Sequence, residues 1–300
     1  MTPIRLLTAA LIVMLATSGA QAEPLARSLF GAKASPTAGP SQPVGTYARG
    51  CAAGLVALPE TGPTWQAMRL SRNRNWGQPQ LVQFLEDLSR YAATLPGWRG
   101  LYIGDLSQPR GGPMTGGHAS HQIGLDADVW MLPPASLRLS RAQRESISSI
   151  SIRTEDQTRI NGNWTPAHMA LLKAAASDPR VDRVFVAAAA KIAMCNQATR
   201  SDKAWLQKIR PIYGHNTHFH VRLKCPPGAP LCETQTPTVA QLSKGGDGCD
   251  ETLNWWVTTY LEELRHPPKR PKQTGPAPKN AKTYVMSDLP AECRTVLSAP

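Results

Sequence analysis

Histidines gather in two short segments of this chain, and their spacing is the first sign of chemistry. Five of the seven histidines lie there: His118 and His121 in one segment, and His215, His218 and His220 in the other. Imidazole nitrogens bind metal ions and also transfer protons near neutral pH. One such histidine is often only a hydrogen-bonded surface residue, but two clusters together favour a shared site.

Two aspartates follow the first histidine cluster in a stretch that we expect to form a strand. The strand is predicted over residues 125–131, and its period of two places Asp126 and Asp128 on one face. A second strand, predicted over 218–223, carries the last two histidines of the second cluster on one face. If the two strands are neighbours, imidazoles and a carboxylate converge.

That collection of side chains suits zinc, which accepts His nitrogen and Asp oxygen and in catalytic sites keeps three protein ligands plus a water. His121, Asp128 and His220 would make such a set. The spacing leaves the choice between Asp126 and Asp128 open, because both side chains point the same way. We interpret His168 and His266 as structural or solvated.

Other catalytic chemistries lack their signatures. Neither G-x-S-x-G nor S-x-x-K occurs in the body of the chain, so a serine nucleophile is disfavoured. No H-E-x-x-H helix supplies a glutamate base. His218, on the same strand face as His220, is therefore the candidate for proton transfer or for stabilising a tetrahedral intermediate. His215 and His118 are auxiliaries at the mouth of the site.

Composition limits the class of protein. The 300 residues are 41% hydrophobic and 18% charged, which is enough for a buried core and excludes disorder throughout. The net charge of +12 suggests an anionic partner, such as a wall polymer, a membrane surface or nucleic acid. Nucleic acid is disfavoured, because no basic stretch with interleaved aromatic residues is present.

The first residues predict export. Arg5 precedes an apolar run from Leu6 to Ala16, and small residues follow it up to Ala20-Gln21-Ala22. This pattern is typical of a secretory signal peptide over 1–22, with a mature chain in the periplasm. The apolar run is shorter than the roughly 20 residues of a membrane helix, and no later window supplies a span.

The cysteines agree with that compartment. All of them lie in the exported part, and an even number in an oxidising compartment predicts three disulfides. Zinc binding by thiolates is the rival interpretation, but no C-x-x-C pair occurs. The six cysteines are Cys51, Cys195, Cys225, Cys232, Cys249 and Cys293.

We expect one folded body between two extended segments. Residues 23–50 are rich in Pro, Ser, Ala and Gly, which predicts an extended N-terminal arm. The body then spans 51–264, the size of a single domain. Residues 265–300 form a C-terminal extension whose Pro- and Lys-rich part, 266–279, should be solvated, although Cys293 could tie its end back to the body.

Helices and short strands interleave along the body. Leucines at helical spacing from Leu81 to Leu95 predict a helix, and Ser140 and Thr165 mark the starts of two more. Further strands are predicted over 101–103 and 183–186. Regular βαβ spacing is absent, so we favour an α+β fold with a small central antiparallel sheet and flanking helices.

These residues also resemble a known family. The spacing His121-x6-Asp128 and the later His218-Phe219-His220 look like the metal signature of the LAS metallopeptidases. The longer strings from Gly117 to Asp128 and from His215 to Cys225 are specifically similar to the penicillin-insensitive murein endopeptidases within that group. The similarity extends from about Cys51 to Cys293.

The resemblance implies a zinc site and three disulfide pairings. It assigns zinc to His121, Asp128 and His220 and leaves Asp126 as a hydrogen-bonding residue behind the ligands. In some members a second ion is placed between the residue that matches His118 and an Asp and a His further along the chain. Here no histidine lies between His121 and His168, which disfavours a second site. The implied disulfides are Cys51 with Cys293, Cys195 with Cys249, and Cys225 with Cys232.

The resemblance also implies a substrate. It is the D-alanyl to meso-diaminopimelyl cross-link of peptidoglycan, hydrolysed by a zinc-activated water, with resistance to β-lactams because no activated serine takes part. The alternative within the enzymes is a zinc D,D- or L,D-carboxypeptidase acting on stem peptides. The alternative of another class is a non-catalytic peptidoglycan-binding protein.

Overall fold

The computed structural model describes residues 23–250, 252–269 and 274–300. The signal peptide predicted over 1–22 lies outside the described residues. No helix in the described part of the chain combines the length and the apolar character that crossing a bilayer requires.

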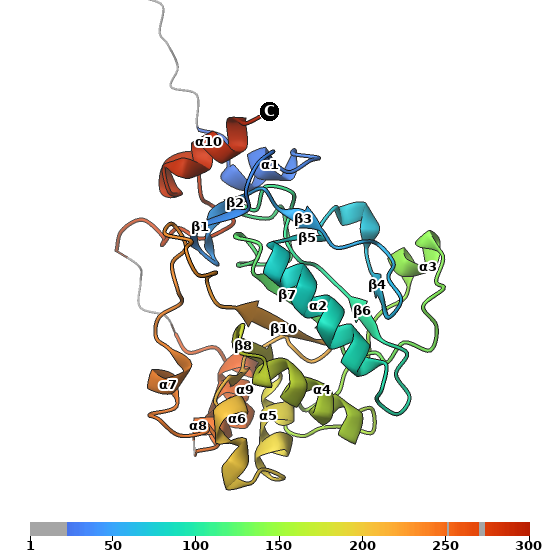
Figure 1. The fold of residues 1–300 in the computed structure, drawn as a ribbon. Coiled ribbons are helices and arrows are strands. Elements are labelled where there is room, and N and C mark those ends of the chain that lie inside the picture. Colours follow the sequence, from blue (N-terminus) through green and yellow to red (C-terminus); the bar gives the residue numbers. More distant parts are fainter. Residues whose placement is uncertain (1–22, 251, 270–273) are drawn as a thin grey trace, which may run out of the picture.

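A six-stranded sheet forms the centre of the molecule (Figure 1). Its strands lie in the order β4-β6-β7-β10-β8-β9, so the two strands with the metal-binding pattern, β7 and β10, are neighbours in the middle. They pair antiparallel, with His220 opposite Asp128. The strands span β4 (Trp65–Ala67), β6 (Leu101–Ile103), β7 (Asp126–Trp130), β8 (Val181–Val186), β9 (Ile209–Pro211) and β10 (His218–Leu223).

The sheet is mixed, so the prediction of an antiparallel sheet is wrong in part. β4 pairs with β6 in parallel, and β8 pairs with β9 in parallel. Parallel neighbours need a crossover connection. Here α2 (Pro79–Ala92) lies between the first two strands in sequence, and α5 (Ala188–Cys195) and α6 (Lys203–Leu206) lie between the second two. The predicted mixture of helices and strands is confirmed.

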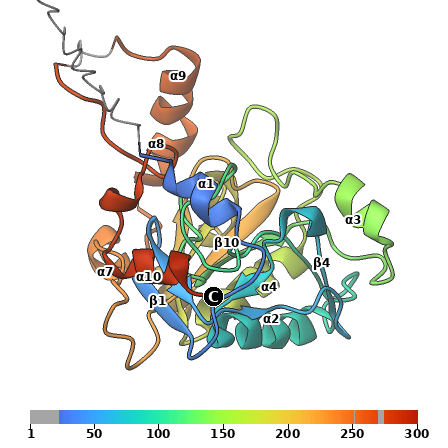
Figure 2. The same cartoon turned by 90° about the horizontal axis from the view of Figure 1, so that it is seen from above.

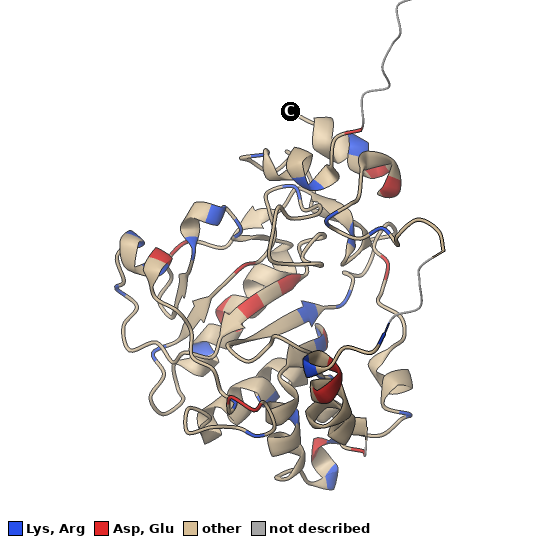
Figure 3. Ribbon diagram, turned by 180° about the vertical axis from the view of Figure 1, so that it is seen from behind, with Lys and Arg blue, Asp and Glu red and all other residues tan. Residues whose placement is uncertain are grey.

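Helices cover one face of the sheet. In Figure 1 α2 and α4 lie in front of it, and their buried side chains form one core with the alternate residues of β7 and β10, such as Val129 and Phe219. Figure 3 shows the opposite face, where acidic residues on a central strand come into view. The helices are α2 (Pro79–Ala92), α3 (Arg141–Ser146), α4 (Pro166–Ser177), α5 (Ala188–Cys195), α6 (Lys203–Leu206), α7 (Val239–Leu242), α8 (Thr252–Val257) and α9 (Thr259–Arg265), with 3-10 turns η1 (Leu70–Arg72), η2 (Arg200–Asp202) and η3 (Met286–Asp288).

Predicted helix starts are confirmed where side chains cap the backbone. The hydroxyl of Ser140 accepts a hydrogen bond from the backbone N–H of Gln143, and the side chain of Gln143 accepts one from the N–H of Ser140. This reciprocal pair satisfies two of the donors that a helix leaves unpaired at its start. Thr165 precedes Pro166 at the start of α4 in the same way that the sequence predicts.

The prediction of an extended arm over 23–50 is wrong. The segment contains α1 (Ala26–Gly31) and β1 (Gln42–Thr46), which pairs with β2 (Arg49–Ala53). Phe30 is fully buried. A periodicity search misses this region because it is short and rich in small residues, and its core is completed by α10 (Glu292–Ser298) from the other end of the chain.

Both chain ends therefore form one lobe. Figure 2 shows α1, β1 and α10 together on one side of the molecule. The disulfide between Cys51 and Cys293 joins β2 to α10, as the resemblance implied. The described residues of 266–279 are exposed and without regular structure, as predicted, whereas η3 and α10 beyond them are folded. A separate short ladder pairs β3 (Val56–Ala57) with β5 (Trp76–Gly77).

The other two disulfides also follow the pairing that the resemblance implied. Cys195 at the end of α5 bonds to Cys249, and Cys225 just after β10 bonds to Cys232. No free cysteine is present among the described residues. The last bridge closes a short loop directly behind the strand that carries His220.

Candidate metal centre and active site

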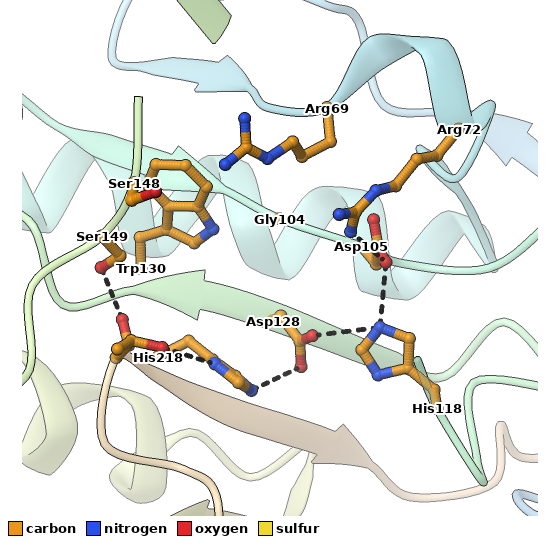
Figure 4. A pocket seen from close by; sticks show the side chains of 11 residues that line it. Arg69, Arg72, Gly104, Asp105, His118, Asp128, Trp130, Ser148, Ser149 and His218 are labelled. Atoms are coloured by element: carbon orange, nitrogen blue, oxygen red, sulfur yellow. Dashed lines mark hydrogen bonds and ion pairs between the residues drawn. The ribbon is translucent and has the colours of Figure 1, made fainter. Parts of the chain in front are cut away.

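A pocket of about 360 Å³ opens beside the central strands. Figure 4 shows two guanidinium groups along one wall and His118, Asp128 and His218 along the other. Its floor comes from β7 and from the start of β10. The lining residues are Arg69, Arg72, Gly104, Asp105, His118, Asp128, Trp130, Ser148, Ser149, Thr217 and His218.

Three predicted ligand residues converge at Asp128, which lines this pocket. His121 Nε2 lies 3.5 Å from Asp128 Oδ1, and His220 Nδ1 lies 3.4 Å from the same oxygen. The rings of His121 and His220 meet edge to face with centroids 4.5 Å apart. Ligand atoms about 2.0 Å from a tetrahedral zinc lie roughly 3.3 Å from one another, so these separations match such a site.

In both histidines, the ring nitrogen that faces away from Asp128 has a polar partner that orients the ring. His121 Nδ1 lies 2.7 Å from the carbonyl oxygen of Leu106, which can only accept, so Nδ1 carries the proton and Nε2 keeps a lone pair. His220 Nε2 lies 3.2 Å from Asp126 Oδ1, and a proton on that nitrogen leaves Nδ1 free to bind a cation. Such outer partners orient metal-binding histidines.

Polar atoms in this cluster are buried without hydrogen-bond partners. In the part of the chain that the structure describes, four buried side-chain atoms lack one, and three of them are His121 Nε2, Asp128 Oδ1 and His220 Nε2. His220 Nε2 faces Asp126 without the alignment of a hydrogen bond. Burying unpaired polar atoms costs free energy, and a cation bound by His121 Nε2 and Asp128 Oδ1 would satisfy two of these three atoms.

Asp126 organises the cluster from behind. It is fully buried, accepts hydrogen bonds from Arg222 Nε at 2.7 Å and Nη2 at 3.0 Å, and also accepts the backbone N–H of His121 at 2.9 Å. That last bond holds His121 at φ +67°, a left-handed conformation that non-glycine residues rarely adopt. Strain of this kind at a functional residue has to be supported by its surroundings.

The β1–β2 hairpin supports the same loop. The amide of Gln122 donates to the carbonyl of Ala48 at 2.7 Å, and its oxygen accepts the N–H of Gly50 at 3.1 Å. The backbone N–H of Gln122 also donates to Tyr47. The lobe closed by the Cys51–Cys293 disulfide therefore fixes the segment that carries His121.

His118 stands beside the cluster as a second candidate ligand. The ligand atoms of His118, His121 and Asp128 lie within 4.8 Å of one another, close enough for these three residues to hold a metal ion. His118 Nε2 is 2.9 Å from Asp105 Oδ2 and 3.7 Å from Asp128 Oδ2. It is therefore already engaged by a carboxylate, whereas His121 Nε2 has no hydrogen-bond partner.

The two candidate catalytic histidines line the approach. His218 lies in the pocket wall with Nε2 3.7 Å from Asp128 Oδ1, and its side chain is partly exposed. The ring of His215 lies behind it, 5.0 Å from that of His218, and its Nδ1 faces the carbonyl of Tyr213. His168 lies apart, bonded to Thr165 and Met131, which fits the structural role predicted for it.

Burial and neighbouring charges set the protonation states. Burial lowers the pKa of His220 to about 3, so this imidazole is neutral and able to bind a cation. Burial raises the pKa of Asp128, but the charges of His218 and His121 outweigh it and hold that pKa well below its usual range. For His121, burial lowers the pKa and the carboxylates of Asp128 and Asp126 more than reverse this. A cation bound there would displace that proton.

Sequence reasoning missed the residues of the opposite wall. Asp105 lies two residues after the predicted strand 101–103, and its Oδ2 is shared by Arg72, Arg74 and His118 at 2.9 to 3.0 Å. Burial by itself would raise the pKa of Asp105. The hydrogen bond and charge of His118 and the charges of the two arginines outweigh burial and lower that pKa to about 2. Arg69 and Arg72 belong to no recognisable sequence motif, because only the tertiary structure brings them to the pocket.

Comparisons with known proteins agree with this geometry. Residues 43–298 match the model of the family described as penicillin-insensitive murein endopeptidase. A protein of that name from Haemophilus influenzae is 37% identical over 262 residues, covering 87% of this chain and 84% of its own. Relatives with the same name from Klebsiella pneumoniae and Escherichia coli are 36% and 35% identical, each covering 96% of both chains. The chain belongs to the penicillin-insensitive murein endopeptidase family.

Proposed function

We propose that this protein is a zinc-dependent murein endopeptidase of the LAS type. It hydrolyses the D-alanyl to meso-diaminopimelyl cross-link of peptidoglycan in the periplasm. Supporting this are the family, the net charge of +12, which suits an anionic polymer, and the signal pattern at the start of the chain. The observation that carries the proposal is that two proposed ligand atoms, His121 Nε2 and Asp128 Oδ1, are buried 3.5 Å apart without hydrogen-bond partners, and that Asp128 lines an open pocket.

His121 Nε2, Asp128 and His220 Nδ1 would hold the zinc. We favour His220 over His118 as the third ligand, because His118 Nε2 already faces Asp105 at 2.9 Å. Zinc, when bound, polarises a carbonyl oxygen and lowers the pKa of a water molecule toward 7. Asp126 keeps His220 turned toward the site, and the carbonyl of Leu106 does the same for His121.

His218 would move the proton. Its partly exposed ring lines the pocket next to Asp128, where it can reach both the attacking water and the leaving nitrogen of a bound peptide. His215 supports it from behind: burial lowers the pKa of His215 to about 4, so it stays neutral beside His218. His118 would hold a second ion only if Asp105 released it.

Digestion of purified muropeptides tests this function. Cross-linked dimers should become monomers in the presence of zinc, should persist when a chelator is present, and should be cleaved again once zinc is restored. Penicillin should have no effect, since no activated serine is recognisable. Loss of terminal D-alanine from pentapeptide monomers, with dimers left intact, would favour the carboxypeptidase instead. Binding without cleavage of either substrate would favour the non-catalytic alternative.

A further inference from the structure

Two arginines form the wall of the pocket that faces the candidate metal centre. Arg69 and Arg72 are three residues apart, one turn of the 3-10 segment η1, so both side chains leave it toward the pocket. Arg69 and Asn73 flank η1 with φ values of +57° and +51°. Left-handed conformations at two non-glycine residues are unusual, and they fix this turn against the cleft.

Arg72 has donors left over for a ligand. Its Nη1 bonds to Asp105 Oδ2 at 3.0 Å, and its side chain is 47% exposed. Among the described residues, no acceptor is bonded to its Nε or Nη2. A guanidinium fixed by one nitrogen and open at the others can receive a carboxylate through two hydrogen bonds.

Arg69 is held more firmly. Its Nη2 donates to the carbonyl of Ile147 at 2.7 Å, and its guanidinium lies 5.5 Å from the centre of the Trp130 ring. Trp130 stands on β7, two residues after Asp128, on the same face of the strand. Arg69 therefore carries its positive charge on the same pocket as the candidate metal site without being free to swing away.

The charge of this wall is unbalanced. The single carboxylate of Asp105 serves both Arg72 and Arg74, and in the described part of the chain no acidic side chain pairs with Arg69. Glu145, a carboxylate on α3, interacts with the charges of Arg69 and Arg72 but forms no ion pair with either in the described part of the chain. Three arginine charges therefore face two carboxylates beside a cavity large enough for a short peptide. Such a wall favours an anionic group of the substrate.

We infer that Arg72, assisted by Arg69, binds the free carboxylate of the residue whose amine forms the cleaved bond. The inference rests on the proposed function. In that cross-link the diaminopimelyl carbon attached to the scissile nitrogen also carries a free carboxylate. This group must enter the same pocket as the scissile carbonyl, and the arginine wall is the cationic surface across from the metal ligands.

A pair of substrates tests the inference. They are two D-alanyl-meso-diaminopimelyl peptides that differ only in this carboxyl group, which is free in one and a primary amide in the other. The wild-type zinc enzyme should cleave the free acid about 10- to 100-fold faster in kcat/KM, the effect of a charge-assisted bidentate contact. In Arg72→Gln the preference should shrink to a few-fold, through loss on the free acid alone and mainly in KM. Arg72→Lys should recover part of the preference.

Arg141→Gln is the matched control, because this exposed arginine pairs with Glu60 outside the pocket. It should keep the wild-type preference, and thermal unfolding should show all variants folded. If Arg72→Gln lowers kcat/KM equally on both substrates, the inference is overturned, and Arg72 instead acts on a part of the substrate that the two peptides share. Equal cleavage of both peptides by the wild type would also overturn it while leaving the proposed function intact. Failure to cleave either peptide would refute the proposed function, and the inference with it.

Discussion

A cluster of ionisable side chains at the pocket and the single lysine Lys191 are both buried in this molecule, and they differ in whether their polar atoms have partners. At the pocket, His121 and Asp128 keep atoms without a hydrogen bond. On α5, Lys191 is equally buried, but its Nζ donates to the carbonyls of Leu206 at 2.7 Å and Asp247 at 2.8 Å. A satisfied buried charge supports a fold, whereas an unsatisfied group of ligand atoms is kept for a function.

The largest effect that separates the two buried sites is on catalysis. His121→Ala should abolish cleavage of muropeptide dimers, by more than the roughly 100-fold reached when only an outer partner of a metal ligand is lost. Lys191→Met should leave the rate per folded molecule unchanged, and His266→Ala, on the exposed tail, is the control for loss of a histidine. Turnover normalised to folded protein measures this. A His121→Ala enzyme with wild-type turnover would break the distinction.

Within the pocket cluster, replacing the partly exposed His218 should have a different effect from replacing a buried metal ligand. His218→Ala should keep its zinc, because His218 is not among the proposed ligands, but should lose activity by about 10²-fold through loss of proton transfer. Metal analysis of the purified variant beside its dimer cleavage distinguishes the two effects. Loss of zinc together with activity would make His218 a ligand and contradict the role proposed for it.

A different disulfide lies next to each of these two buried sites, so removing the disulfides one at a time tests whether the sites differ in function. Cys51–Cys293 closes the lobe that supports His121, and Cys195–Cys249 joins α5 to the segment next to Asp247. Replacing either pair by alanine should lower the free energy of unfolding by about 2 to 5 kcal/mol. Only loss of the first should also weaken zinc binding, by up to about 10-fold, as measured by competition with a chromogenic chelator. Equal zinc affinity in both variants would show that the hairpin does not position the loop.

Free-thiol titration checks the premise of that experiment. The denatured, unreduced protein should give almost no reaction, because all of the cysteines are paired in the described structure. Two or more reactive thiols per chain would show that at least one of the three disulfides is absent.

The last effect is a pH dependence of stability at Lys191. Burial, and to a lesser degree the charge of Arg210, lowers the pKa of Lys191 from 10.5 to about 7. The unfolded chain therefore binds more protons than the folded one between pH 7 and 10.5, so this group makes stability rise with pH across that window. Denaturant unfolding of Lys191→Met should lack this rise. Parallel stability curves for wild type and variant would show that Lys191 titrates normally.

The sequence predicted the site better than the wall opposite it. Period two placed Asp128 on one face of one predicted strand and His220 on one face of another, because this signal is local. That the two strands are neighbours is shown by the structure. The same reasoning could not choose between Asp126 and Asp128. In the structure Asp126 is turned to Arg222, an ion pair between residues far apart in sequence that no local pattern reports.

The errors in the predicted fold have a similar cause. The parallel pairings of β4 with β6 and β8 with β9 depend on crossovers through α2, α5 and α6, which periodicity does not register. The folded lobe over 23–50 depends on a partner helix, α10, near the opposite end of the chain. Composition alone therefore suggested an arm where long-range packing and a disulfide make a structure.

Metal content of two histidine variants tests the central claim most directly. The ligand atoms of His118, His121 and Asp128 lie within 4.8 Å of one another, and His220 Nδ1 lies 3.4 Å from Asp128 Oδ1, but only His220 is proposed as the third ligand. Elemental analysis of zinc-loaded, desalted protein should find close to one zinc per chain in the wild type and in His118→Ala, and almost none in His220→Ala. Zinc retained by His220→Ala and lost from His118→Ala would contradict the proposed ligand set.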